Sequence, residues 1–160
     1  GSGRFQVNSD GMTSGGTSSI KVTDSATLAY ASKADLGAGA VTVDKDATME
    51  VASGVHTFDG GLTLNDGATL SFNFTKRTVA PQIAIAEGKT LTVEGEVKVK
   101  IPENSKWPTG GEKILTTCGG FAGKTVKLVD PPNWVRSLSV NADGNVVLDV
   151  KPKGTMVIVR

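Results

Sequence analysis

Acidic residues occur in close pairs along the chain, which is the arrangement that polysaccharide hydrolases and lyases need for acid–base catalysis. The pairs are Asp44 with Asp46, Asp59 near Asp66, and Glu94 with Glu96. Several of these acids lie beside lysines in short polar segments between apolar stretches, as in Asp44-Lys45-Asp46. Acids in such segments are usually solvated turn residues. We therefore expect no catalytic residues, and we predict that the protein is not an enzyme.

The chain contains one histidine, His56, and one cysteine, Cys118. These numbers exclude an internal disulfide and most catalytic zinc sites. Neither residue lies in a nucleophile motif, and we expect Cys118 in the core and His56 at the surface or in a turn. Calcium could be imagined at the Asp44/Asp46 turn or at Asn141/Asp143, but neither is followed by the further oxygen ligands of a calcium loop. We expect no metal and no cofactor.

The charge balance excludes two further classes of partner. The 160 residues include 17 Lys and Arg against 16 Asp and Glu, which leaves a net charge of +1. A nucleic-acid-binding domain usually carries a strong basic excess, so we expect no nucleic-acid partner. Since no apolar stretch approaches about 18 residues, we also expect no membrane insertion.

The strongest pattern is an internal repeat. Four eleven-residue segments align without gaps, and each begins 21 residues after the one before it. In each segment, alternating apolar residues flank a polar or glycine-containing corner, which is typical of two short strands with one buried face. A unit this short cannot bury that face alone, so successive units must stack. The segments are IKVTDSATLAY from Ile20, VTVDKDATMEV from Val41, LTLNDGATLSF from Leu62 and IAIAEGKTLTV from Ile83.

This repeat predicts an all-β, single-domain parallel β-helix with 21-residue coils, and parallel crossovers favour the right-handed form. The first apolar residues of the four segments, Ile20, Val41, Leu62 and Ile83, are predicted to stack in one interior column. A threonine ladder of Thr27, Thr48, Thr69 and Thr90 is predicted on the outer face.

The repeat also sets the expected boundaries of the domain. Residues 1–3, Gly-Ser-Gly, have the composition of a cloning scar, and the β-helix domain is predicted to span residues 4–160. Regular coils are expected over about 20–101. From about 102 to 160 prolines interrupt the pattern, so we expect irregular coils and a cap that covers the end of the helix. Within this part, Leu138–Val150 resembles the repeat with two extra corner residues.

The outer face is the candidate binding surface. The strand residues Thr42 and Thr63 align at the 21-residue spacing, and the corner residues Asp44 and Asn65 follow them. Flat, hydroxyl-rich faces accept extended polymers, although threonine also simply suits exposed strand positions. Trp107 and Trp134 lie in the proline-rich tail, where an indole either plugs the end of the helix or projects as a stacking platform for a sugar ring.

Two known groups share these features. The units of the form LTLNDGATLSF, and the ending ILTTCGGFAGKTVKL…WVRSLSVNADGNVVLDV, resemble the β-helical passenger repeats of autotransporters over residues 20–150. A β-helix of this size without a catalytic cluster is also similar to the β-helical xylan-binding modules attached to gut bacterial xylanases. The second resemblance rests on size and architecture.

These resemblances imply two alternative functions. The first is a non-catalytic carbohydrate-binding module that holds an attached glycoside hydrolase on plant cell-wall polysaccharide, with xylan as the expected glycan. Its expected binding residues are Trp107, Trp134, Thr42, Thr63, Asp44 and Asn65. The second is a structural or adhesive fragment of a bacterial surface protein. Both imply a secreted or cell-surface location, with the signal peptide outside this sequence.

Overall fold

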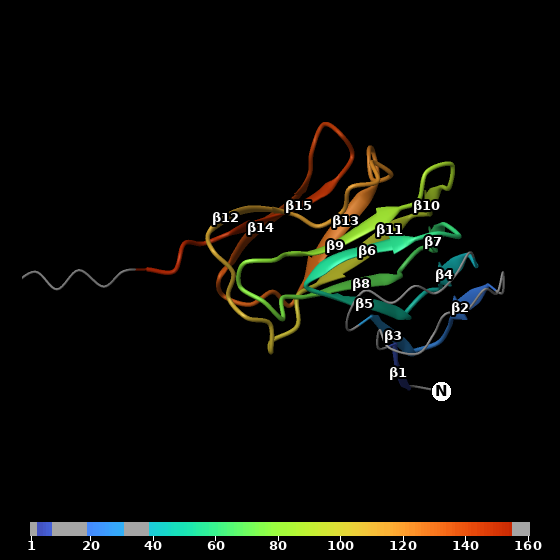
Figure 1. The fold of residues 1–160 in the computed structure, drawn as a ribbon, viewed down its shortest axis with the longest axis horizontal. Helices are drawn as coiled ribbons and strands as arrows, with labels where there is room; N and C mark the ends of the chain where they lie inside the picture. The colour runs from blue at the N-terminus through green and yellow to red at the C-terminus, as the bar shows by residue number, and fades with distance from the viewer. Residues whose placement is uncertain (1–2, 8–18, 31–38, 155–160) are drawn as a thin grey trace, which may run out of the picture.

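The computed structural model describes residues 3–7, 19–30 and 39–154. Within these ranges the chain forms strands and turns and contains no helix (Figure 1), which confirms the all-β prediction. Residues 155–160, the end of the predicted cap, lie outside the described residues. The strands are β1 (Arg4–Val7), β2 (Ile20–Val22), β3 (Thr27–Tyr30), β4 (Val41–Val43), β5 (Thr48–Ala52), β6 (Gly54–Phe58), β7 (Leu62–Leu64), β8 (Thr69–Asn73), β9 (Pro81–Ile85), β10 (Leu91–Val93), β11 (Glu96–Lys100), β12 (Gly111–Ile114), β13 (Thr125–Val129), β14 (Val135–Val140) and β15 (Val146–Val150).

The repeat segments form two parallel sheets. One sheet has six strands in the order β1-β3-β5-β8-β11-β13, and the other has four in the order β10-β7-β4-β2. Through the first three segments the register follows the 21-residue spacing, so that Ile20 lies beside Val41 and Val41 beside Leu62. Parallel neighbours need a long connection, and 21 residues here carry the chain from one strand to the next beside it.

The fourth segment departs from this spacing, and the predicted position of Ile83 is wrong. Leu91, not Ile83, lies beside Leu62, which is a step of 29 residues. In the six-stranded sheet Lys98 likewise lies beside Thr69, at the position predicted for Thr90. The regular 21-residue repeat therefore ends after the third segment.

The reason is that Ile83 belongs to a different sheet. Strand β9 contains Ile83 and pairs in parallel with β6, which places Ile83 beside His56. The exposed loop at residues 75–79 precedes β9 and lengthens the path from β8 to β10. The alternating pattern of IAIAEGKTLTV predicts a strand correctly, but alternation does not specify which sheet the strand joins.

The interior columns of the two sheets form the core. In the six-stranded sheet Leu28, Met49, Leu70 and Val99 are register neighbours and are each at most 4% exposed. The four-stranded sheet contributes Val41 and Leu62, which are similarly buried. Phe5 occupies the end of the first column, beside Leu28, and is 60% exposed.

The C-terminal part of the described chain is antiparallel. Strands β12, β15 and β14 form a three-stranded sheet at the end of the molecule away from β1 and β2 (Figure 1). The interpretation of Leu138–Val150 as a further repeat is therefore wrong, because this segment is a hairpin. Its turn is closed by Asn141, whose side-chain oxygen accepts bonds from the amides of Asp143 and Asn145.

We predict that Leu70→Ala destabilises the protein by about 2–5 kcal/mol, because Leu70 is fully buried and its truncation leaves a cavity. Chemical denaturation measures this change in the free energy of unfolding. Thr125→Ala is the matched control, since Thr125 is an exposed strand residue and its loss should cost much less. Equal costs for the two variants would contradict the packing of this column.

Candidate functional site

Three successive corners between the two parallel sheets are closed by the same backbone hydrogen bond. In each, the residue that follows the first strand accepts a hydrogen bond at its carbonyl oxygen from the amide three residues later. Asp and Asn are favoured at this first turn position, because their side chains bond nearby backbone groups. The three bonds run from Ala26 to Thr23 (3.2 Å), from Ala47 to Asp44 (3.1 Å) and from Ala68 to Asn65 (2.9 Å).

Each corner also contains one residue in the left-handed region of backbone space. The φ angles are 54° at Asp24, 63° at Asp46 and 81° at Gly67, and Gly95, in a fourth corner that follows β10, has a φ of 68°. Gly adopts this conformation freely, and Asp and Asn tolerate it better than other residues. The corner geometry therefore explains why Asp and Gly recur at the corners, where sequence analysis alone could take them for catalytic residues.

The corners line a polar groove of about 730 Å³. The backbone ladder continues one residue beyond the four-stranded sheet, because the amides of Asp44, Asn65 and Glu94 donate to the carbonyls of the adjacent strand at 2.9–3.0 Å. Polar side chains from four neighbouring strands are thereby held in one row. We call this surface the corner groove, and its lining residues are Thr23, Asp24, Ser25, Asp44, Lys45, Asp46, Asn65, Asp66 and Glu94.

Side-chain contacts fix the middle of the groove. The Asn65 amide donates to Oδ1 of Asp44 at 2.7 Å, and Lys21 Nζ lies 3.0 Å from Oδ2 of the same carboxylate. The Lys21 contact, with help from Asn65, lowers the pKa of Asp44 although partial desolvation opposes the shift. Asp44 is therefore held ionised at neutral pH and is a hydrogen-bond acceptor rather than a general acid.

One glycine is required by a close approach across the groove. The Asp66 side chain accepts a 2.7 Å bond from the backbone amide of Glu96. A Cβ atom at Gly95 would lie 2.2 Å from Oδ1 of Asp66, so only glycine fits there. This bond ties the corner that follows β7 to the corner that follows β10.

Of the six predicted binding residues, Asp44 and Asn65 line the corner groove, and Thr42 and Thr63 lie on the adjoining strands β4 and β7 without lining it. Thr42 and Thr63 are register neighbours, and each lies two residues before Asp44 or Asn65. Strand alternation therefore directs Thr42 and Thr63 to the same outer side of the sheet as the corner residues. Thr42, Thr63 and Asn65 are candidates to bind a ligand through hydroxyl or amide groups, and Asp44 is a candidate through its carboxylate.

The two tryptophans lie away from this group. Trp134 is 6% exposed, and its ring packs edge-on against Phe74 with centroids 5.8 Å apart. Trp107 is partly buried, and its indole nitrogen donates to the carbonyl of Lys151 at 3.0 Å. Both indoles have structural contacts, and the burial of Trp134 leaves no open face on which a sugar ring could stack.

Sequence reasoning missed several members of the groove, notably Thr23 and Glu94. The turn position shared with Asp44 and Asn65 would have identified Thr23. Glu94 was hidden because the step to β10 is 29 residues rather than 21. Asp46, Asp66 and Glu94 were noted only in acid pairs or, for Asp46, as part of a possible calcium turn.

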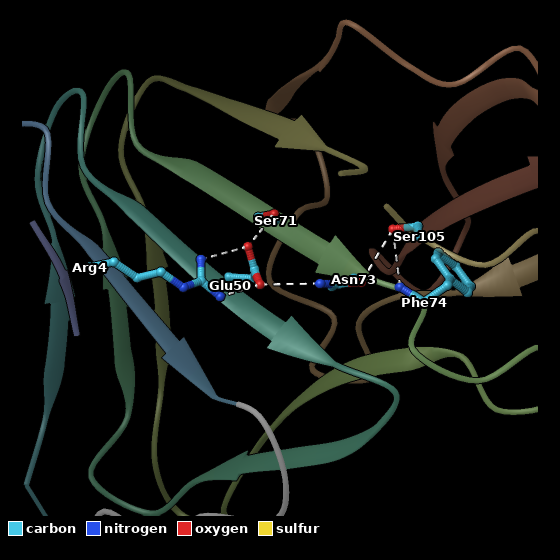
Figure 2. Close-up of polar contacts among 6 residues, drawn as sticks. All are labelled: Arg4, Glu50, Ser71, Asn73, Phe74 and Ser105. Carbon is cyan, nitrogen blue, oxygen red and sulfur yellow. Dashed lines mark hydrogen bonds and ion pairs between the residues drawn. The ribbon is translucent and has the colours of Figure 1, made fainter. Parts of the chain in front are cut away.

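A second polar cluster lies on the outer face of the six-stranded sheet (Figure 2). Arg4 forms an ion pair of 2.8 Å with Glu50, which also accepts bonds from Ser71 and Asn73 at 3.5 and 3.3 Å. Burial alone would raise the pKa of Glu50, but the bonds from Arg4, Asn73 and Ser71 outweigh it and lower the pKa. Ser105 links Asn73 to the backbone of Phe74, which extends the cluster toward the C-terminal part. The contacts indicate a structural network.

His56 is buried, so the prediction of a surface or turn position is wrong. It is 4% exposed on β6, and its Nε2 donates to the carbonyl of Ala52 at 2.9 Å. Its Nδ1 has no hydrogen-bond partner, and its ring packs edge-on against Tyr30. Desolvation lowers the pKa of His56 despite the bond to Ala52. Cys118 is half-buried, and burial raises the pKa of its thiol.

Within residues 3–7, 19–30 and 39–154, no group of three or more His, Cys, Asp or Glu side chains is arranged to hold a metal ion. The same ranges contain no helix long and apolar enough to cross a membrane. No family model, no curated protein and no solved structure matches the chain. The assignment of function therefore rests on the geometry of the groove.

We predict that Trp134→Ala lowers the free energy of unfolding by about 3–5 kcal/mol, because the indole fills space against Phe74. Thermal and chemical denaturation measure the loss. Trp134→Phe should retain most of the stability, since a second aromatic ring preserves part of the contact. A folded Trp134→Ala variant of unchanged stability would refute the packing role of Trp134.

We predict that stability falls as the pH is lowered through the range just below about 6.5, the usual pKa of histidine. The folded pKa of His56 is depressed, so the unfolded chain binds a proton that the folded chain does not. The slope should be at most about 1.4 kcal/mol per pH unit. Denaturation between pH about 7.5 and 5.5 measures it, and His56→Gln should flatten the curve. The pKa values of Asp44 and Glu50 are lowered, so these acids titrate at lower pH.

Proposed function

We propose that the protein is a non-catalytic polysaccharide-binding module and that the corner groove holds the glycan. One observation carries this proposal: the row of polar side chains Thr23, Asp44, Asn65 and Glu94 comes from four adjacent parallel strands. Parallel strands lie about 4.8 Å apart. This spacing is close to the advance per sugar in an extended β-linked chain, so successive sugars can meet successive strands.

The chemistry of the groove favours a neutral glycan. Sugar hydroxyls donate to carboxylates, and the groove contains the acids Asp24, Asp44, Asp46, Asp66 and Glu94 but only Lys45 as a lining cation. Lys21 and Lys98 partly neutralise Asp44 and Asp46 from the rim, at 3.0 and 3.7 Å. A polyuronate would be repelled by the remaining negative charge. Xylan is the neutral-backbone plant glycan that the resemblance to xylanase-attached modules implies.

We propose further that the parallel strands follow one right-handed β-helical path. Strands β4, β5 and β6 follow one another in sequence and pair, in the same order, with β7, β8 and β9. In this view each group of three strands is one coil, and the corner groove runs along the stack. The module would be secreted or at the cell surface and tethered to a glycoside hydrolase.

The second candidate function is a structural or adhesive fragment of a bacterial surface protein. It is favoured by the structural contacts of both tryptophans, since the residues lining the corner groove include no aromatic ring. Without a stacking platform, binding would depend on hydrogen bonds alone. The two candidates therefore differ in whether glycans bind the isolated domain at all.

We predict binding to soluble xylan with a dissociation constant between micromolar and millimolar. The affinity should rise with oligosaccharide length until the glycan spans all four strands. Asn65→Ala and Glu94→Ala should each weaken binding about two- to tenfold, which corresponds to about 0.5–1.5 kcal/mol per hydrogen bond. Calorimetry and affinity gels with xylan, glucan, mannan and polygalacturonate measure the binding, and polygalacturonate should not be retained.

Thr125→Ala is the control for these substitutions, because Thr125 is exposed on β13 and does not line the groove. Its affinity should match that of the unaltered protein. Failure of every neutral glycan to bind would refute the module and leave the surface-structure candidate. An equal loss in Thr125→Ala would place the binding site elsewhere.

A further inference from the structure

Asp130 has an unusual backbone conformation that the corner turns do not explain. Its φ angle is 43°, and it is one of three residues other than glycine with a positive φ among the described residues. The other two, Asp24 and Asp46, lie in the corners, where this conformation recurs. Asp130 instead follows β13 and directly precedes Pro131. Its conformation therefore needs a separate explanation.

The proline makes this conformation still less favourable. A proline ring restricts the residue before it to extended conformations with a negative φ. A residue with a side chain is already strained at a positive φ. Asp130 thus departs from two backbone preferences at once, and strain of this kind is often found at functional sites.

The structure holds the strained linkage from both sides. On the N-terminal side of Asp130, β13 pairs in parallel with β11. On the C-terminal side, the amide of Val135 donates to the carbonyl of Pro132 at 3.0 Å, and Trp134 is buried. Asp130 therefore cannot adopt an extended conformation without loss of neighbouring contacts.

The residue types at this linkage can react with each other. An aspartic acid side chain can attack its own main-chain carbonyl through a five-membered ring, and the basic nitrogen of proline is a better leaving group than an ordinary amide nitrogen. The sequence contains no other Asp-Pro pair. Asp130 is exposed and lines an open hollow of about 660 Å³ with Lys100, Glu103 and Asn104. Water can therefore reach the linkage.

We infer that the chain cleaves itself once, in mild acid, between Asp130 and Pro131. The protonated carboxyl of Asp130 attacks its own main-chain carbonyl carbon, and the carboxyl proton passes to the nitrogen of Pro131. The bond between that carbon and the nitrogen breaks, which leaves a cyclic anhydride on Asp130 and a free amine on Pro131. One water molecule then opens the anhydride to two carboxyl groups. The net reaction is the hydrolysis of one peptide bond.

The strain in the folded protein favours this reaction. Cleavage removes the restriction that Pro131 places on Asp130, so the strain is released as the bond breaks. Strain of the usual size corresponds to a rate increase of about 5- to 150-fold if the transition state releases all of it. The charged side chains that line the hollow with Asp130 are Lys100 and Glu103, and their charges are opposite. The folded chain should therefore be cleaved faster than the unfolded chain.

Cleavage would leave the two pieces associated. The second piece contains β14 and β15, and β15 pairs with β12 of the first piece. Val146 and Leu148 of β15 are also fully buried in the core. The cleaved protein should therefore keep its native size, and the two pieces should separate only on denaturation.

Mass spectrometry of the denatured protein tests this inference, after incubation at the lowest pH at which circular dichroism shows the folded state. The expected products are residues 1–130 and 131–160, formed at a rate that does not depend on protein concentration. The bond after Asp143, which is exposed and precedes a glycine, should stay intact as an internal control. The same chain unfolded in urea at the same pH should be cleaved at least about fivefold more slowly.

Two variants separate the carboxyl group from the backbone strain. Asp130→Gly is the matched control, because glycine adopts a φ of 43° freely but has no carboxyl group, so this variant should fold and stay intact. Pro131→Ala keeps the carboxyl group but removes the proline restriction, and it should slow cleavage at least about fivefold. The absence of fragments from the folded protein, equal or faster cleavage in urea, or cleavage that persists in Asp130→Gly would each overturn the inference.

Discussion

The structure depends on the parallel register between successive strands. Backbone bonds such as that from the Thr48 amide to the Ala26 carbonyl, at 2.9 Å, hold each strand level with its neighbour. Side chains alternate across a strand, so a slip of one residue would turn Met49 and Leu70 outward and Thr48 and Thr69 inward. The same register that buries the apolar columns thus also aligns the polar corners. The groove and the core are two results of one constraint.

The sequence predicts this register for as long as the connections between strands keep one length. The segments from Ile20, Val41 and Leu62 have matching corners and an equal spacing, and the structure pairs them accordingly. After β8 the chain makes a longer loop before β9, so the 21-residue spacing no longer identifies the neighbouring strand. Ile83 and Leu91 both begin alternating apolar segments, and only the three-dimensional path shows that Leu91 continues the column. A pattern of period two reports burial of a face but not the identity of the neighbouring strand.

The candidate site was predictable to the extent that it follows from the turns. Asp44 and Asn65 share a turn position, so their alignment could be inferred from the repeat. The fates of Trp107, Trp134 and His56 could not be inferred, because each depends on contacts with residues distant in the sequence. Trp134 packs against Phe74, and His56 packs against Tyr30. Residue type alone suggested an exposed position for His56 and left a packed and an exposed role open for each tryptophan, and contacts between distant residues decided among them.

The bond between Asn65 and Asp44 supports both a structural and a binding role for the corner groove. A satisfied 2.7 Å contact stabilises the stacked corners without any ligand. It does not exhaust the acceptors, because a carboxylate has about four lone-pair sites and only Asn65 and Lys21 contact the side chain of Asp44 in the described part of the protein. The remaining acceptors are held in fixed positions by those same contacts. Because these acceptors are already ordered in the folded protein, binding a glycan hydroxyl would cost little further conformational entropy. Weak hydrogen bonds can then add up to a measurable affinity.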